Sequence, residues 1–154
     1  MNTQVLPLLE KAGCAVTKVV KTEGAEHAGQ IVVDLLDSSS AHLTVILCSG
    51  DGTLHEIINT VSTSVPQGHR SVETPARLNL ALVPCGTANA LYSSFFPPAN
   101  EMDNDWKLQS LRSFIAQGPV RPLTLSITTL SSPPSLRQPP KGEHSPHIVA
   151  DIVR

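Results

Sequence analysis

VILCSGDGTLHE, residues 45–56, is the stretch that decides the fold of this chain. An apolar run rich in β-branched residues stops at Ser-Gly-Asp-Gly-Thr, and apolar residues then recur at helical spacing as far as Val61. The pattern predicts a buried central strand over residues 43–48, a tight glycine turn, and a helix over residues 53–61. Such a turn, between a buried strand and a helix N-terminus, is where α/β proteins bind phosphate groups and place acidic catalytic residues.

LALVPCGTANAL, residues 80–91, repeats this arrangement farther along the chain. We expect a strand over residues 78–83, a turn at Gly86, and a short helix over residues 87–95 that Pro97 and Pro98 interrupt. Strands that alternate with helices favour an α/β fold, here a three-layer, mainly parallel sheet with helices on both faces. Because the carboxyl ends of parallel strands meet at one edge of a sheet, both glycine turns should lie on that edge.

The remaining segments extend the alternation. Further helices are predicted over residues 5–12, 26–36 and 105–116, and further strands over residues 14–20, 120–130 and 147–153. Residues 64–75 are polar and should form a surface loop. We expect one α/β domain over residues 1–130, a Pro/Ser-rich loop or linker over residues 131–146, and the start of a second, β-rich domain over residues 147–154.

Composition limits the classes of function. The chain has 154 residues and a formal net charge of -2, which suits one domain and gives no reason to expect nucleic acid as its main partner. Three widely spaced cysteines without a Cys-x-x-Cys pair argue against zinc and favour a reducing compartment, and Cys14 and Cys48 should be small core residues. No signal-peptide pattern and no apolar run of roughly 20 residues is present. We therefore expect a cytoplasmic protein with no transmembrane segment. If its substrate is a lipid, the protein must meet that lipid from the aqueous side of a membrane.

The first glycine turn carries residues that suit phosphate chemistry. Gly50 and Gly52 permit backbone angles that are closed to other residues and let backbone N–H groups approach phosphate oxygens. Thr53 could cap the following helix or bond a phosphate oxygen. Asp51 is unexpected, since a carboxylate repels phosphate unless a metal ion or a substrate hydroxyl lies between them. This residue suits Mg²⁺ coordination, directly or through water, or general-base action on a hydroxyl.

Each turn also has a simpler interpretation. Gly-Asp-Gly is a common turn sequence in proteins that bind nothing there. The second turn could be no more than a helix start with Thr87 or Asn89 as its cap, although Asn89 could also hydrogen-bond a ligand. Glu56 is favourable near a helix N-terminus through the helix dipole alone. Neither turn is a Walker A loop or a Gly-x-Gly-x-x-Gly loop.

Taken together, the two turns resemble those of a known family. Ser-Gly-Asp-Gly-Thr at 49–53 and Pro-x-Gly-Thr-x-Asn at 84–89 are similar to the catalytic domain of the diacylglycerol kinase family, which includes the sphingosine (long-chain base) kinases and is related to NAD kinase. His-Glu at 55–56 and Asn-Ala-Leu at 89–91 resemble the sphingosine kinase branch most. The resemblance covers about residues 3–130. It implies a nucleotide-binding domain of the NAD kinase/diacylglycerol kinase type.

The resemblance also implies an activity, which is transfer of a phosphoryl group from ATP, with Mg²⁺, to the hydroxyl of a sphingoid base or diacylglycerol. Asp51 would be the catalytic acidic residue, or the residue that organises Mg²⁺ directly or through water. It would draw the proton from the lipid hydroxyl while backbone N–H groups and Mg²⁺ stabilise phosphate charge. By position, the residues that would bind the nucleotide are Thr22, Ser49, Gly50, Asp51, Gly52, Thr53, Gly86, Thr87 and Asn89.

The sequence departs from the family pattern at its two ends. The family begins with a strand that leads into an Asn-Pro-x-x-Gly loop, and it adds a β-sandwich domain after the nucleotide-binding domain. This chain begins after that loop and stops near the start of the second domain, so we expect a domain truncated at both ends. Two alternatives stay open: a catalytically inactive fragment with at most weak nucleotide binding, and an enzyme similar to NAD kinase.

Overall fold

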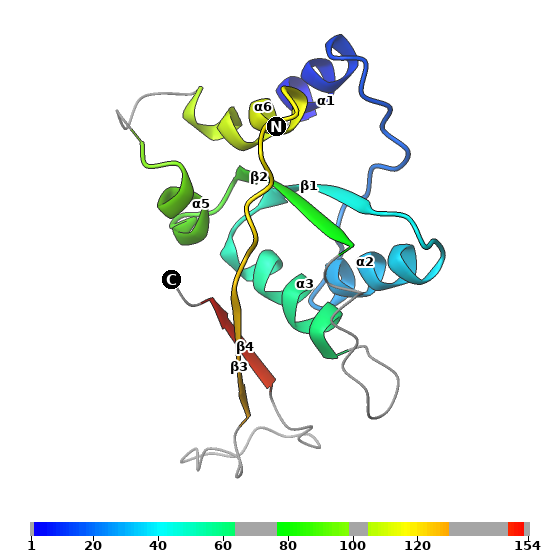
Figure 1. Ribbon diagram of the computed structural model, residues 1–154, viewed down its shortest axis with the longest axis vertical. Coiled ribbons are helices and arrows are strands. Elements are labelled where there is room, and N and C mark those ends of the chain that lie inside the picture. The colour runs from blue at the N-terminus through cyan, green and yellow to red at the C-terminus, as the bar shows by residue number, and fades with distance from the viewer. Residues whose placement is uncertain (1, 64–76, 99–104, 130–147, 153–154) are drawn as a thin grey trace.

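A two-stranded parallel sheet lies at the centre of the molecule (Figure 1). The computed structural model describes residues 2–63, 77–98, 105–129 and 148–152. Strands β1 (Leu43–Ser49) and β2 (Leu78–Pro84) pair in parallel from Leu43 opposite Leu78 to Ser49 opposite Pro84. Both strands therefore end at the same edge of the sheet, β1 directly before Gly50 and β2 two residues before Gly86.

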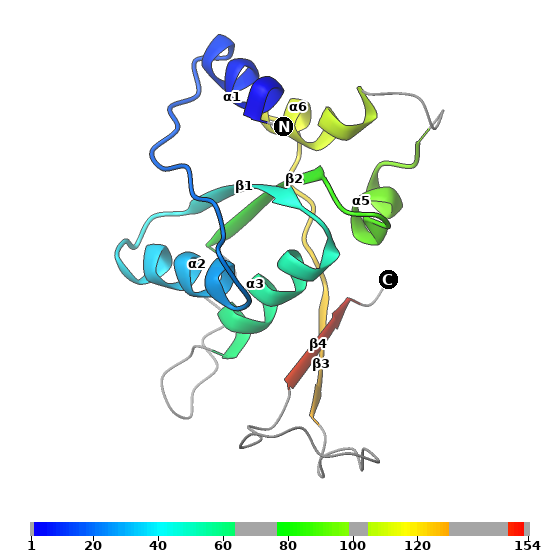
Figure 2. The same cartoon turned by 180° about the vertical axis from the view of Figure 1, so that it is seen from behind.

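Helices cover both faces of this sheet, as the views from opposite sides show (Figures 1 and 2). Helices α2 (His27–Asp37) and α3 (Asp51–Thr63) lie on one face. On the other face lie α1 (Asn2–Lys11), the short 3-10 helix η1 (Trp106–Leu108) and α6 (Gln109–Ile115). Helix α5 (Ala90–Phe95) follows the second turn. The predicted helix–sheet–helix layering is thus confirmed, around a sheet that has two strands within the described residues.

Alternating side chains of β1 explain the two layers. Val45 and Leu47 pack into the cluster formed by α2 and α3, whereas Ile46 packs against α1 and α6. Because successive side chains of a strand point to opposite faces, an uninterrupted apolar run requires apolar partners on both sides. On the first face the core contains Leu36 and Ile57, each about 1% exposed.

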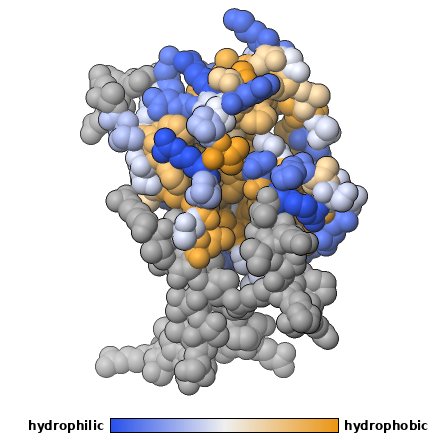
Figure 3. Space-filling model, viewed as in Figure 1, coloured by the Kyte–Doolittle hydropathy of each residue, from blue (hydrophilic) through white to orange (hydrophobic). Residues whose placement is uncertain are grey.

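Most predicted elements match the structure. The five predicted helices and the strands predicted over residues 43–48 and 78–83 are present, with ends that differ by a few residues, and α1 ends before Gly13, which has a φ of 71°. Figure 3 shows apolar side chains at the surface in the middle of one face, among polar ones. The predicted loops over residues 64–75 and 131–146 lie outside the described residues.

The strand predicted over residues 14–20 is wrong. These residues form no helix or strand, and Val16, Val19 and Val20 are 42%, 59% and 41% exposed. A strand exists only when its backbone N–H and C=O groups pair with a neighbouring strand. Within the described residues β1 pairs only with β2, so the valine-rich segment has no strand beside it. Cys48 is also exposed rather than part of the core.

A second, separate pair of strands lies at the C-terminal end of the described chain. β3 (Leu125–Thr129) and β4 (Ile148–Ile152) are antiparallel. The strand predicted from residue 120 begins only at Leu125, which lies opposite Ile152, the last residue of β4. Leu123 and Leu125 pack against α3, which joins this part of the chain to the domain. Among the described residues, no helix has the length and apolarity needed to cross a membrane.

Candidate functional site

The two glycine turns touch at the carboxyl edge of the sheet. A Cβ placed on Gly86 would lie 2.7 Å from the Cα of Gly50, and a Cβ on Gly50 would lie 3.1 Å from the Cα of Gly86. The backbone N–H of Cys85 donates to the carbonyl of Ser49 at 2.9 Å and extends the sheet by one more bond. Glycine is therefore required at both positions because the two backbones approach closely.

The glycines of the first turn were predicted to adopt backbone angles that are closed to other residues, and this prediction is wrong. Neither Gly50 nor Gly52 has a positive φ; among the described glycines only Gly13 does. Gly52 belongs to the first turn of α3, and a Cβ placed on it would meet open space. Nothing inside the described chain explains a glycine at 52. Its missing side chain instead leaves the backbone at the start of α3 open to an approaching group.

Asp51 is the first residue of α3 and links the two turns. Its Oδ2 accepts a hydrogen bond of 3.0 Å from the backbone N–H of Ala90, the first residue of α5. The predicted helix start near Thr53 is thus two residues late, and Thr53 is the third helical residue rather than the cap. A carboxylate in the first turn of α3 is favourable because the positive end of the helix dipole faces it.

The side chain of Asn89 closes the second turn through two hydrogen bonds to the backbone of Gly86, which we call the clasp. Its side-chain Oδ1 accepts from the backbone N–H of Gly86 at 2.9 Å, and its Nδ2 donates to the carbonyl of Gly86 at 2.6 Å. The residue lies in the left-handed region, with φ 49° and ψ 49°, and is 9% exposed. Asn89 is the N-cap residue of α5, as the simpler interpretation allows, but its side chain makes no capping bond to that helix. Both polar atoms of the side chain are used within the turn.

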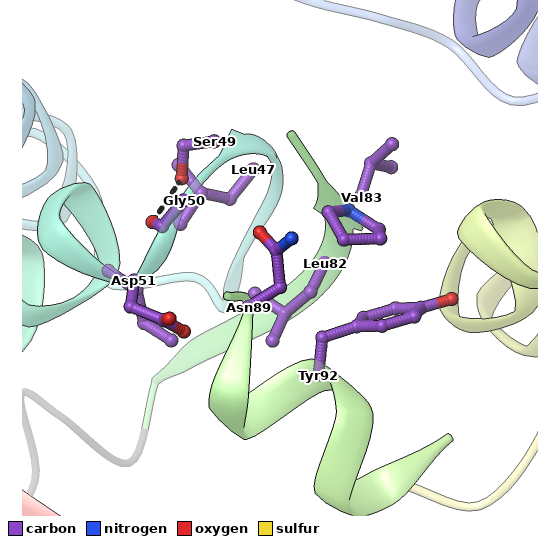
Figure 4. A pocket seen from close by; sticks show the side chains of 10 residues that line it. Leu47, Ser49, Gly50, Asp51, Leu82, Val83, Asn89 and Tyr92 are labelled. Atoms are coloured by element: carbon purple, nitrogen blue, oxygen red, sulfur yellow. Dashed lines mark hydrogen bonds between the residues drawn. The ribbon is translucent and has the colours of Figure 1, made fainter. Parts of the chain in front are cut away.

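Asp51 and Asn89 face the same crevice between the turns (Figure 4). The crevice has a volume of about 20 Å³, which is room for one water molecule and far less than a nucleotide needs. It is lined by Leu47, Ser49, Gly50, Asp51, Leu54, Leu82, Val83, Pro84, Asn89 and Tyr92. A nucleotide would therefore lie over the outer surface of the turns.

The remaining predicted site residues do not line the crevice. Gly52, Gly86 and Thr87 are exposed, and Thr53 is half-buried on α3. Thr22 is exposed in the irregular segment that leads to α2. The fold brings the two glycine turns together, and Thr22 is not among the residues that line the crevice between them.

Tyr92 also lines the crevice, although nothing in the sequence around it indicated a place in the site. This side chain is 2% exposed, and its hydroxyl donates to the carbonyl of Trp106. Its ring centroid lies 5.0 Å from that of Phe96 and 5.1 Å from that of Trp106. Burial raises the pKa of the Tyr92 hydroxyl, while the nearby backbone N–H groups of Ser110 and Gln109 act in the opposite direction. Tyr92, Phe96 and Trp106 thus pack against one another beside the crevice.

Glu56 also has a partner that its sequence position did not reveal. Its Oε1 accepts a 3.1 Å bond from the backbone N–H of Gly29, in the first turn of α2. The N-cap residue of α2, Glu26, makes no side-chain capping bond. Glu56 therefore satisfies an N–H group at the start of α2 from the neighbouring helix. This contact holds α2 against the helix that begins at the site.

The chemistry of the turns fits an anion together with a divalent cation. The first backbone N–H groups of α3 have no partner within the helix, and Gly52 leaves them accessible. Asp51 uses Oδ2 for Ala90, and among the described residues its Oδ1 has no hydrogen-bond partner. The described residues contain no group of three or more His, Cys, Asp or Glu side chains that could hold a metal. Mg²⁺ suits such a place, because it is bound by one or two carboxylates together with phosphates and water.

Comparisons with known proteins agree with this geometry. Residues 1–122 match the model of the diacylglycerol kinase catalytic domain family. The chain is 32% identical over 136 residues to human sphingosine kinase 2, an alignment that covers 85% of this chain. The same alignment covers 19% of the relative, so the chain spans about a fifth of that protein's length. The family match covers most of the sequence, including both glycine turns, and the chain therefore belongs to the diacylglycerol kinase catalytic domain family.

Proposed function

We propose that the chain is the nucleotide-binding part of an ATP-dependent lipid kinase, which transfers a phosphoryl group to the hydroxyl of a sphingoid base or diacylglycerol. One observation carries the proposal: the two glycine turns meet, and the carboxylate of Asp51 lies between them at the N-terminus of α3. Family membership supports a lipid substrate, and the similarity to sphingosine kinase 2 favours a sphingoid base.

The first turn supplies the contacts to phosphate in this proposal. The N–H groups of residues 50–53 are aligned with the positive end of the α3 dipole, which favours phosphate oxygens. The hydroxyl of Ser49 donates to the carbonyl of Gly50 at 3.1 Å and so stiffens the turn. Thr53 and Thr87 offer hydroxyls near the ends of the two turns, and Thr22 would contact the nucleotide outside them.

Asp51 carries the chemical step. With Oδ2 held by the N–H of Ala90, its Oδ1 is the oxygen available to accept a proton from the lipid hydroxyl or to hold Mg²⁺ directly or through water. Mg²⁺, when bound, supplies positive charge that offsets the charge on the phosphates. Removal of the hydroxyl proton makes the lipid oxygen a better nucleophile toward the terminal phosphorus of ATP.

The acceptor would be reached from the aqueous side of a membrane. We propose a cytoplasmic protein that contacts membranes peripherally, because the substrate is a lipid and the described helices are too short to cross a bilayer. The two partners in this proposal are ATP and a lipid at the membrane surface.

The test is phosphorylation of sphingosine and of diacylglycerol in detergent micelles with radiolabelled ATP. Asp51→Asn retains an acceptor for Ala90 and removes the charge, so it separates chemistry from folding. We expect a loss of activity of about 10²–10⁴-fold, the usual range for an acid–base group. Asp37→Asn, a charge change at an exposed aspartate at the end of α2, is the matched control. Equal activity of Asp51→Asn and the unaltered chain would remove Asp51 from its role.

The same assay tests the alternative of an inactive chain. Binding of Mg²⁺-ATP without phosphorylation of either lipid would overturn the kinase proposal for this chain and support a nucleotide-binding fragment.

A further inference from the structure

We infer that Asn89 is a positioning residue that acts through Asp51, rather than a residue that contacts the nucleotide. The inference rests on the proposed function, in which Asp51 carries the chemistry. The family resemblance implied that Asn89 binds the nucleotide, and the inference gives Asn89 a different role. Three features of the second turn support it: the bonds of the Asn89 side chain, its backbone conformation, and the partner of the next residue.

Each polar atom of the Asn89 side chain is bonded to the backbone of Gly86. Oδ1 and Nδ2 bind the two backbone groups of Gly86 at 2.9 and 2.6 Å, and the residue is 9% exposed. If the amide turned toward a nucleotide, it would weaken the two bonds that hold Gly86. The paired bonds instead fix the separation between Gly86 and Asn89, which is what a tight turn needs.

The backbone of Asn89 directs the next N–H group at Asp51. Non-glycine residues seldom adopt a positive φ, and asparagine is among those that tolerate it best. With φ at 49° and ψ at 49°, Asn89 reverses the chain direction, and the N–H of Ala90 then donates to Oδ2 of Asp51 at 3.0 Å. The orientation of the Asp51 carboxylate thus depends on a conformation that Asn89 provides.

Gly86 connects the clasp to the first turn. A Cβ placed on Gly86 would lie 3.2 Å from Oδ1 of Asn89 and 2.7 Å from the Cα of Gly50. Asn89 therefore holds Gly86 against Gly50, while Ala90 holds Asp51. The contact between Gly86 and Gly50 and the bond between Ala90 and Asp51 together fix Oδ2 of Asp51, so Oδ1 keeps a constant direction.

The test uses Asn89→Gly and Asn89→Asp in the 154-residue chain. Glycine accepts the left-handed conformation but lacks the clasp, and aspartate keeps an acceptor for the Gly86 N–H but loses the donor. The primary measurement is amide hydrogen exchange at Ala90 by NMR, which needs no kinase activity. We expect exchange at least about 10-fold faster in Asn89→Gly, with partial retention of protection in Asn89→Asp.

A double-mutant cycle shows whether Asn89 acts through Asp51. Asp51→Ala removes the acceptor, so exchange at Ala90 should already be fast, and Asn89→Gly should add little in that background. In enzyme assays Asn89→Gly should lower kcat at least about 10-fold while the Kd for Mg²⁺-ATP changes less than about 3-fold. If Asn89→Gly does not fold, the same comparisons are made with Asn89→Asp.

Two results would overturn the inference. Unchanged protection of Ala90 in the folded Asn89 variants would show that Asn89 does not orient the Ala90 N–H. A 10-fold or larger rise in the Kd for Mg²⁺-ATP with protection intact would show a ligand contact instead. Failure of the kinase proposal is distinguishable, because it removes catalysis from the unaltered chain and leaves the exchange experiment to decide the role of Asn89.

Discussion

Replacement of Gly86 by alanine tests whether the two turns touch as the structure shows. The new Cβ would lie 2.7 Å from the Cα of Gly50. Carbon atoms in contact prefer separations of about 3.5–4.0 Å, so the turns would have to separate by roughly 0.8 Å or more. Both atoms belong to the backbones of short turns at strand ends, and no flexible side chain can move aside to relieve the contact.

The expected cost follows from overpacking. Forced backbone shifts in packed sites cost about 1–3 kcal/mol, and Gly86→Ala should fall in the upper half of that range. For a chain of this size that corresponds to a fall in Tm of about 4–12 °C. Gly50→Ala should cost less, because its Cβ would lie 3.1 Å from the Cα of Gly86. We therefore expect the loss of stability to be larger for Gly86→Ala than for Gly50→Ala.

Gly52→Ala is the matched control, because the same methyl group would meet open space there. Its free energy of unfolding should stay equal to that of the unaltered chain or rise by about 0.5–1 kcal/mol, as alanine is the better helix former. Urea unfolding followed by circular dichroism gives all three values. Equal stability of Gly86→Ala and Gly52→Ala would refute the close contact between the turns, and with it the shared site.

Three further predictions concern residues around the site. Tyr92→Phe should lower the free energy of unfolding by about 0.5–1.5 kcal/mol in urea titrations, because the part-buried hydrogen bond to the carbonyl of Trp106 is lost; no loss would contradict the placement of Tyr92. Glu56→Ala should cost about 0.5–2 kcal/mol by the same method, and Glu56→Gln should recover most of it, because it keeps an acceptor for the Gly29 N–H; equal losses in both would contradict this bond. Burial and the nearby Cys48 raise the pKa of Cys85. The protonated thiol of Cys85 therefore contributes stability to the folded state, and this contribution is complete below the pKa of an unfolded thiol, about 8.5. The contribution is lost as the pH rises through the higher pKa of the folded state. Urea titrations at pH 7.5 and 10 should show a fall in stability at pH 10 that is smaller in Cys85→Ser, and an equal fall in both proteins would contradict this account.

The sequence predicted the centre of the fold well. The β1–α3 and β2–α5 units were predicted because apolar runs, glycines and helical spacing agree with one another over short distances. Pairing of the two strands in parallel then brings the turns together without further information. The valine-rich residues 14–20 show the limit of such reasoning, since local composition cannot supply the neighbouring strand that a strand requires.

The contacts within the site could not be predicted from the sequence. The bond from Ala90 to Asp51 joins residues 39 positions apart, and that from Gly29 to Glu56 joins residues 27 apart. Local patterns contain no information about such pairs. The glycines at 50 and 86 were predicted to matter, but the reason was different. Their backbones approach each other closely, and neither needs a positive φ.

Titration of the ¹⁵N-labelled chain with Mg²⁺-ATP tests the central claim most directly. The claim is that two neighbouring turns form one phosphate-binding surface beside Asp51. It predicts saturable shifts of the backbone amide signals, with the largest changes at residues 50–53 and 86–90. Saturable changes confined to other parts of the chain, or no change at millimolar Mg²⁺-ATP, would contradict the claim.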